Sequence, residues 1–219
     1  MLSRFAVSRT ALREAYRVLA AKGMIVARQK VGTRVRPVAD WNALDPEVLA
    51  WHFQAAPKEK LVEDLFTVRK MIEPEAAAIA AAARSPVTLG RLKDAYARMV
   101  QYRHGEGDLV AADLEFHMVI LEARNNPFLA ALGALINTSL QAVFKYSWQG
   151  AARIQTERLR QHEEVYLAIR NGDPNEARHR MMTLLEDSIK DIRKVLRPAH
   201  RSADRARERG HARSPNPPT

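Results

Sequence analysis

The side chains of Asp113, His117 and His162 are of types that bind metal ions or transfer protons. Asp113 and His117 are four residues apart, so on a helix they lie one turn apart on the same face. Burying a carboxylate and an imidazole costs free energy unless they are hydrogen-bonded or hold a metal ion. We expect the pair to be buried, because the same face carries the apolar residues Phe116, Ile120 and Leu121.

A metal site is one interpretation of this cluster. A carboxylate and two imidazoles suit zinc and similar divalent ions, with His162 supplied by a later helix. A second interpretation is that Asp113 hydrogen-bonds His117 in a packed bundle that holds no metal. A third is a metal-dependent enzyme acting on a small organic acid, because catalytic zinc sites combine three protein ligands with an open position. One observation argues against the enzyme interpretation: no carboxylate is clearly placed as a general base.

Composition limits the class of protein. The chain has 219 residues, nine glycines and no cysteine, so disulfides, thiolate metal sites and cysteine nucleophiles are excluded. The sequence has no apolar run long enough to span a membrane, and its start lacks the apolar segment of a signal peptide. We therefore expect a cytoplasmic protein. Abundant helix-forming residues and little apolar alternation predict an all-α fold.

Positive charge is concentrated at the two ends of the chain. The net charge is +10, and residues 1–36 hold nine Lys or Arg against one acidic residue. Residues 197–219 hold six Arg against two acidic residues. A basic N-terminal segment on a nearly neutral body predicts nucleic-acid binding confined to one end. The alternative is a basic surface that is merely solvated.

The first 36 residues have the pattern of a helix followed by a hairpin. Residues 9–21 carry apolar side chains at helical spacing, with Ser8 as N-cap and Gly23 as the left-handed residue after the helix. Residues 25–36 are β-prone on both sides of Gly32. This order is the second half of a winged helix-turn-helix, in which the start of the recognition helix enters the major groove. Lys30 in the wing would add a phosphate contact.

The same segment resembles the GntR family of bacterial repressors. The resemblance rests on the run from Ser8 to Ala15 and on Leu19, Gly23, Gly32, Thr33 and Val35. It implies that the residues touching operator DNA are Arg9, Thr10, Arg13, Gly32 and Thr33. Domains of this family open with a further helix and a full positioning helix, so we expect a winged helix-turn-helix that is truncated at its N-terminus.

The remaining chain is predicted to be a linker, a bundle and a tail. Residues 37–60 form the linker, which we expect Leu44, Leu49 and Trp51 to dock onto the domains. Residues 61–196 read as a bundle of six to seven antiparallel helices, and residues 197–219 as a disordered basic tail. In the helix over 61–83, Pro74 predicts a kink or break. The inward residues of that helix are expected to be Leu65, Val68, Ile72, Ala76 and Ile79.

The bundle resembles the ligand-binding and dimerisation domain (FCD domain) of the FadR-like branch of GntR regulators. This resemblance rests on Val68, Arg69, Glu73, Pro74, Asp113, Phe116, His117, Asn126, Pro127, His162, Ala168, Ile169, Gly172 and Asp173. It implies a bundle that binds a small organic acid, often beside a metal held by one Asp and three His. Asp113, His117 and His162 match three of these ligands. The fourth His would fall at Leu184, so the implied site has three protein ligands.

Within this branch the chain looks most like the galactonate-operon repressors. The matching segments are 40–51, 141–144 and 148–150. The resemblance implies a sugar acid similar to galactonate as effector, and a homodimer that binds a palindromic operator. Arg69 is the natural clamp for a carboxylate, because guanidinium and carboxylate pair through two parallel bonds. The alternative for Arg69 is a structural salt bridge to a neighbouring helix.

Two further residues and one further function remain open. Asn126 and Asn137 would contact sugar hydroxyls or would only cap and pack helices. A chain that binds the ligand but has lost DNA binding is the alternative to a DNA-binding repressor.

Overall fold

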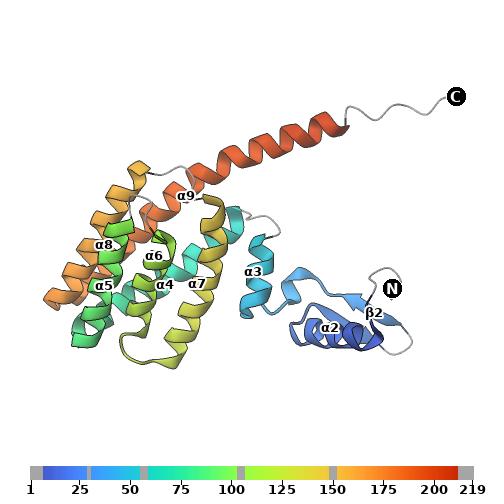
Figure 1. The fold of residues 1–219 in the computed structure, drawn as a ribbon, viewed down its shortest axis with the longest axis horizontal. Coiled ribbons are helices and arrows are strands. Elements are labelled where there is room, and N and C mark those ends of the chain that lie inside the picture. The colour runs from blue at the N-terminus through green and yellow to red at the C-terminus, as the bar shows by residue number, and fades with distance from the viewer. Residues whose placement is uncertain (1–6, 29–30, 55–58, 103–106, 148–151, 212–219) are drawn as a thin grey trace.

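The computed structural model describes residues 7–28, 31–54, 59–102, 107–147 and 152–211. In the described part of the chain, a small head of one helix and a two-stranded hairpin leads through a linker helix into a larger helical bundle (Figure 1). The predicted all-α class with a small wing is confirmed.

The first described element of the head is helix α2 (Arg9–Ala21), and its two ends lie where the sequence predicts them. Ser8 Oγ accepts a hydrogen bond from the Ala11 backbone N–H at 3.1 Å, and Gly23 has a left-handed φ of 72° after the last turn. Strands β1 (Ile25–Arg28) and β2 (Gly32–Val35) then pair antiparallel, with Ile25 opposite Val35. This hairpin is the predicted wing.

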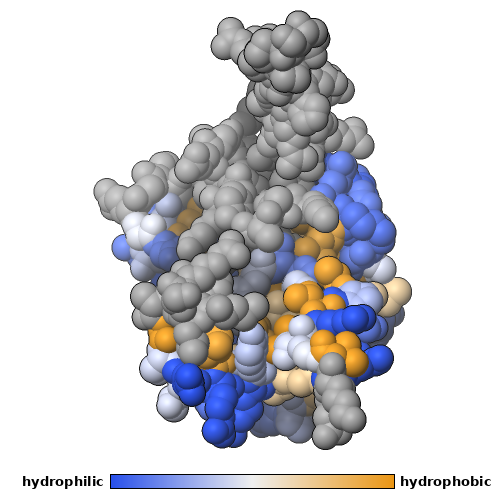
Figure 2. Space-filling view, turned by 90° about the vertical axis from the view of Figure 1, so that its right-hand side faces the viewer, coloured by the Kyte–Doolittle hydropathy of each residue, from blue (hydrophilic) through white to orange (hydrophobic). Residues whose placement is uncertain are grey.

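The head buries little apolar surface. None of the α2 side chains is buried, and Val35 in the wing is 74% exposed. A space-filling view from the side on which the head lies shows apolar surface exposed among hydrophilic residues (Figure 2). A unit with so small a core gains little stability from its own packing. Contacts with the linker must therefore contribute to the stability and orientation of the head.

The linker contains a single turn, η1 (Val38–Asp40), and helix α3 (Pro46–Gln54). Val48 is fully buried and Leu49 packs against the core of the bundle, and α3 lies against α7. Leu44 is 71% exposed, so the expectation that it docks the linker is wrong, whereas Leu49 packs as expected and the Trp51 ring lies 5.6 Å from Lys22 Nζ of the head. Leu49 of α3 therefore anchors the linker on the bundle.

Six described helices form the bundle. They are α4 (Glu59–Ala83), α5 (Pro86–Tyr102), α6 (Leu109–Glu122), α7 (Pro127–Ser147), α8 (Ala152–Asn171) and α9 (Pro174–His211). Helix α4 runs unbroken through the buried Pro74. Helix α9 continues past 196, where the sequence suggested a disordered tail, and extends beyond the bundle (Figure 1). Among the described residues, no helix combines the length and apolarity required to cross a membrane.

Candidate metal centre

Helix α6 supplies the first two residues of the site. Asp108 caps its N-terminus by accepting a hydrogen bond from Ala111 N–H at 2.9 Å. Asp113 and His117 are both buried, as predicted from the apolar residues around them. Helix α8 brings the buried His162 to the same place. One ligand atom from each of these three residues lies within 4.8 Å of the other two.

The ring of His162 is oriented by its own helix. Its Nδ1 lies 2.7 Å from the backbone oxygen of Arg158, to which it donates a hydrogen bond as Nδ1–H. Its Nε2 then faces Asp113 Oδ1 at 3.0 Å and His117 Nε2 at 3.4 Å. Asp113 therefore pairs with His162, and not with its helical neighbour His117 as the metal-free interpretation of the sequence proposed.

Helix α4 places a second carboxylate and a cation behind His117. Glu73 Oε2 lies 2.7 Å from His117 Nδ1, although the two atoms do not form an aligned hydrogen bond. Arg69 donates to both oxygens of Glu73, from Nε at 2.5 Å and from Nη2 at 3.2 Å. The Arg69 guanidinium also lies over the Phe66 ring, 4.9 Å from its centroid. Arg69 thus forms a salt bridge within its own helix instead of with a neighbouring one.

Both buried carboxylates are held in their charged form. Burial alone would raise the pKa of Glu73, but the charge of Arg69, together with the neighbouring His117, outweighs it and lowers the pKa to about 2. Burial would likewise raise the pKa of Asp113, and the hydrogen bond and charge of His162 lower it to about 2. The site therefore keeps two negative charges in a largely dry interior.

Three electron-rich atoms converge in this arrangement. The Nδ1 of His162 donates to a backbone oxygen, and the Nδ1 of His117 faces Glu73, so we assign the proton of each neutral ring to Nδ1. Both Nε2 lone pairs then point toward each other and toward the Asp113 carboxylate. Such atoms repel unless a proton or a metal cation lies between them. A proton there would give the hydrogen bond from His162 that lowers the pKa of Asp113, and a divalent ion would take the place of that proton. A divalent ion fits this donor set, and a carboxylate behind one ligating histidine is a common support for metal sites.

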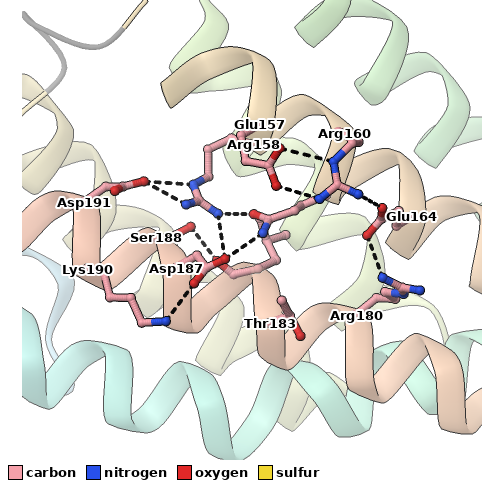
Figure 3. Close-up of polar contacts among 12 residues, drawn as sticks. Glu157, Arg158, Arg160, Glu164, Arg180, Thr183, Asp187, Ser188, Lys190 and Asp191 are labelled. Atoms are coloured by element: carbon pink, nitrogen blue, oxygen red, sulfur yellow. Dashed lines mark hydrogen bonds and ion pairs between the residues drawn. The ribbon is translucent and has the colours of Figure 1, made fainter. Parts of the chain in front are cut away.

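Polar contacts join α8 to α9 at residues 158–164 of α8, the stretch of sequence that includes His162; Figure 3 shows these contacts. Arg158 Nη2 lies 2.8 Å from Asp191 Oδ2, and the amide of the buried Gln161 donates to Asp187 at 2.8 Å. Arg158 also donates to the Gln161 side-chain oxygen. These contacts fix α8 on α9, and so fix the backbone oxygen that orients the His162 ring.

The other residues proposed from the sequence lie in different settings. Asn126 is exposed and caps α7, because its Oδ1 accepts from Phe128 N–H at 2.9 Å. Asn137 is half-buried, and its Oδ1 accepts from the Gln141 side chain at 3.3 Å. Leu184, the position of the absent fourth histidine, is buried in the core of the bundle. The effector roles of the two asparagines stay predictions.

The described residues that are predicted to contact DNA are exposed to solvent. Arg9, Thr10 and Arg13 are exposed on the first turns of α2, and Gly32 and Thr33 are exposed in the wing. Lys30 lies outside the described residues. Exposure leaves these side chains accessible to a nucleic acid, and their contacts with DNA stay predictions.

Sequence reasoning did not assign a role to Glu73, although the residue completes the site. The signal for it was present as an Arg and a Glu four residues apart, which on a helix form an ion pair. Its burial could not be inferred, because it depends on α6 bringing His117 against it.

Comparison with known proteins identifies the family. A family model described as FCD domain matches residues 64–187, and one described as bacterial regulatory proteins, gntR family, matches residues 1–35. The galactonate operon transcriptional repressor of Escherichia coli is 29% identical over 191 residues, which cover 87% of this chain and 83% of that protein. The transcriptional regulator LutR of Bacillus subtilis is 28% identical, over 86% of this chain and 85% of that protein.

Solved structures share the fold. A structure of Lar from Listeria monocytogenes has a TM-score of 0.61 and 16% sequence identity, and covers 89% of this chain and 84% of that chain. The winged head, the helical bundle and the two family matches define a ligand-responsive class of DNA-binding protein. The chain belongs to the GntR family of regulators, with an FCD domain as its bundle. These relatives are transcriptional regulators, which confirms the expectation that the chain is not an enzyme.

The pairing of Arg69 with Glu73 makes a prediction about stability. Replacing Glu73 by Gln leaves the Arg69 guanidinium buried without a counter-charge, so the free energy of unfolding should fall by about 3–5 kcal/mol near neutral pH. Because the pKa of Glu73 is lowered from 4.5 to about 2, its stabilising contribution is complete above pH 4.5 and is lost as the pH falls toward 2. The difference between the two proteins should therefore shrink in acid.

Chemical denaturation at several pH values measures this difference. Glu75→Gln is the control. Glu75 also lies on α4 but forms an exposed ion pair with Arg178 of α9, so its loss should change stability little. If the two variants lose the same free energy of unfolding, the buried pair contributes no more to stability than an exposed one.

Proposed function

We propose that this regulator represses transcription by binding operator DNA through its winged head, and that a small sugar acid bound beside a divalent metal ion in the bundle controls that binding. The observation that carries the proposal is the convergence of a carboxylate and two imidazole nitrogens within 4.8 Å, all on buried residues. A cation satisfies these atoms, and a cation with only three protein ligands accepts further ligands.

The open coordination positions suit a hydroxy acid. Zinc and similar ions bind carboxylate and hydroxyl oxygens, and a sugar acid offers both groups on adjacent carbons. Galactonate is the effector class we favour, because a relative similar over most of the chain is the galactonate operon transcriptional repressor. When bound, the metal would supply a positive centre for the carboxylate. Asp113, His117 and His162 would hold it, with Glu73 behind His117.

Arg69 enters this proposal as a supporting charge as well as a clamp. Glu73 occupies its Nε and Nη2, so a bond to the effector carboxylate would use the remaining N–H groups. Its guanidinium also offsets the two carboxylates of the site, which otherwise would repel an acid. Asn126 and Asn137 are the proposed contacts for sugar hydroxyls.

Control of DNA binding follows from a shift between domain arrangements. A homodimer would present two heads to a palindromic operator, with half-sites about one helical turn apart. An effector that binds one arrangement better than the other moves the equilibrium by its difference in affinity. Such a regulator would act in the cytoplasm, where its operator is.

The effector proposal predicts a metal-dependent binding of galactonate. With zinc or nickel present, calorimetry should show binding of galactonate, and fluorescence anisotropy should show a changed affinity for operator DNA selected from a random library. Galactose, which lacks the carboxylate, is the matched control and should not bind. His162→Gln should weaken both metal and galactonate binding, because it removes a ligand. Galactonate binding that is equal with and without metal would contradict the proposed site.

The DNA proposal predicts that Arg13 reads bases. Arg13→Ala should weaken operator binding by about 1–3 kcal/mol and relax base preference at one position of each half-site. Arg91→Ala is the control, because Arg91 forms an ion pair with Glu122 on the bundle and lies outside the head. If Arg13→Ala binds the selected operator as tightly as the wild type, the recognition role is wrong. If the wild type selects no sequence at all, the chain is a ligand-binding relative without operator binding.

A further inference from the structure

Lys22, at the end of α2, differs from the other described cations of the head because its side chain is only 11% exposed. Its Nζ lies 2.7 Å from Asp45 Oδ2 and 2.6 Å from Glu47 Oε2, and it sits 5.6 Å from the centroid of the Trp51 ring. Asp45 directly precedes α3, and Glu47 and Trp51 lie within it. Lys22 is therefore committed to the linker helix and not available to DNA.

Asp45 connects the two helices directly. Its Oδ1 accepts hydrogen bonds from Glu47 N–H at 2.9 Å and from Val48 N–H at 3.2 Å, and so caps α3. Both oxygens of the same carboxylate also accept hydrogen bonds from Lys22 Nζ. The hydrogen bond to Asp45 raises the pKa of Lys22, and the hydrogen bond from Lys22 lowers the pKa of Asp45, so both stay charged at neutral pH.

The backbone around Lys22 is also bound to the linker. Asn42 N–H donates to Lys22 O at 3.0 Å, and the Trp41 indole donates to Arg36 O at 3.1 Å. A Cβ on Gly23 would lie 2.9 Å from Asp40 O, so the linker approaches the end of α2 as closely as a glycine permits. Residues 36–45 thus wrap the end of the recognition helix.

The linker helix in turn contacts the bundle. Helix α3 packs on α7, with Leu49 against the core of the bundle, and α7 packs on α6, which carries Asp113 and His117. A continuous series of contacts therefore runs from the candidate metal centre to the recognition helix. The ionic contact of Lys22 is the point where this series passes from the linker helix into the head.

We propose that Lys22 is a positioning residue for DNA binding: its ion pairs with Asp45 and Glu47 fix the recognition helix on α3, so that movements of α3 on the bundle reorient the head. The fixing of the head stands on the geometry alone. The transmission of an effector signal rests on the proposed function.

Distance measurements between two spin labels test the fixing of the head. The chain has no cysteine, so single cysteines at the exposed Ala11 on α2 and Ala134 on α7 can be labelled without background. Labelled protein is mixed with excess unlabelled protein, so that only distances within one chain are recorded. The wild type should give a narrow distribution, and Lys22→Met should give a broad one.

Three further variants separate the ionic contact from general damage. Asp45→Asn keeps a capping side chain but removes the charge, so it should broaden the distribution as Lys22→Met does. Lys22→Arg keeps the charge and should retain the narrow distribution. Lys60→Met removes an exposed lysine paired with Asp64 on α4 and should have no effect. A distribution as narrow in Lys22→Met and Asp45→Asn as in the wild type would overturn the proposal.

Binding measurements test the consequence for DNA. If the released head spends about a tenth of its time in the binding orientation, operator affinity should fall on the order of tenfold. Galactonate affinity should be unchanged in Lys22→Met, while the effect of galactonate on operator affinity should be lost. Full affinity and full response in this variant would contradict the positioning role. A wild type that binds no galactonate contradicts the proposed effector instead, and leaves the distance measurement as the test of Lys22.

Discussion

The bundle depends on neutralising charge that it buries. Helix α4 carries Arg69 and Glu73 into the interior, and α6 and α8 bring Asp113 and two histidines against them. None of these groups is tolerated alone in a dry core, because an unpaired buried charge costs several kcal/mol. The three helices are therefore restricted to an arrangement in which each carboxylate meets a cation or a ring nitrogen. The apolar core around them then sets the spacing at which the three ligand atoms converge.

The sequence predicted the centre of the site well and its surroundings less well. Spacing on one helix predicted the burial of Asp113 and His117, and a third ligand from a later helix was expected. The inward face of α4 was predicted partly wrongly, since Val68 is 38% exposed and Ile79 is 40% exposed. Hydrophobic periodicity treats charged residues as outward, whereas Arg69 and Glu73 face inward. Only the placement of α6 and α8, which is tertiary information, shows that their burial is compensated.

The head is held by a different kind of contact. Its wing and recognition helix were foreseen from caps, glycines and β-prone residues, which act locally. The way in which the linker holds the head was not foreseen. Polar contacts at the end of α2, with Lys22 at their centre and the Trp51 ring beside it, replace the apolar docking expected of Leu44. In some proteins buried ionic contacts specify orientation more than stability, and this is the role proposed here for Lys22.

A metal titration tests the central claim most directly. Zinc binding is measured by competition with a coloured chelator at about pH 7.5 and at about pH 5.5, on either side of the ordinary histidine pKa of about 6.5. The account predicts one ion per chain, affinity that falls in acid because the rings must be neutral to bind, and strong weakening in Asp113→Asn. Zinc affinity that is the same at both pH values and in that variant would show that the three converging atoms do not form a metal site.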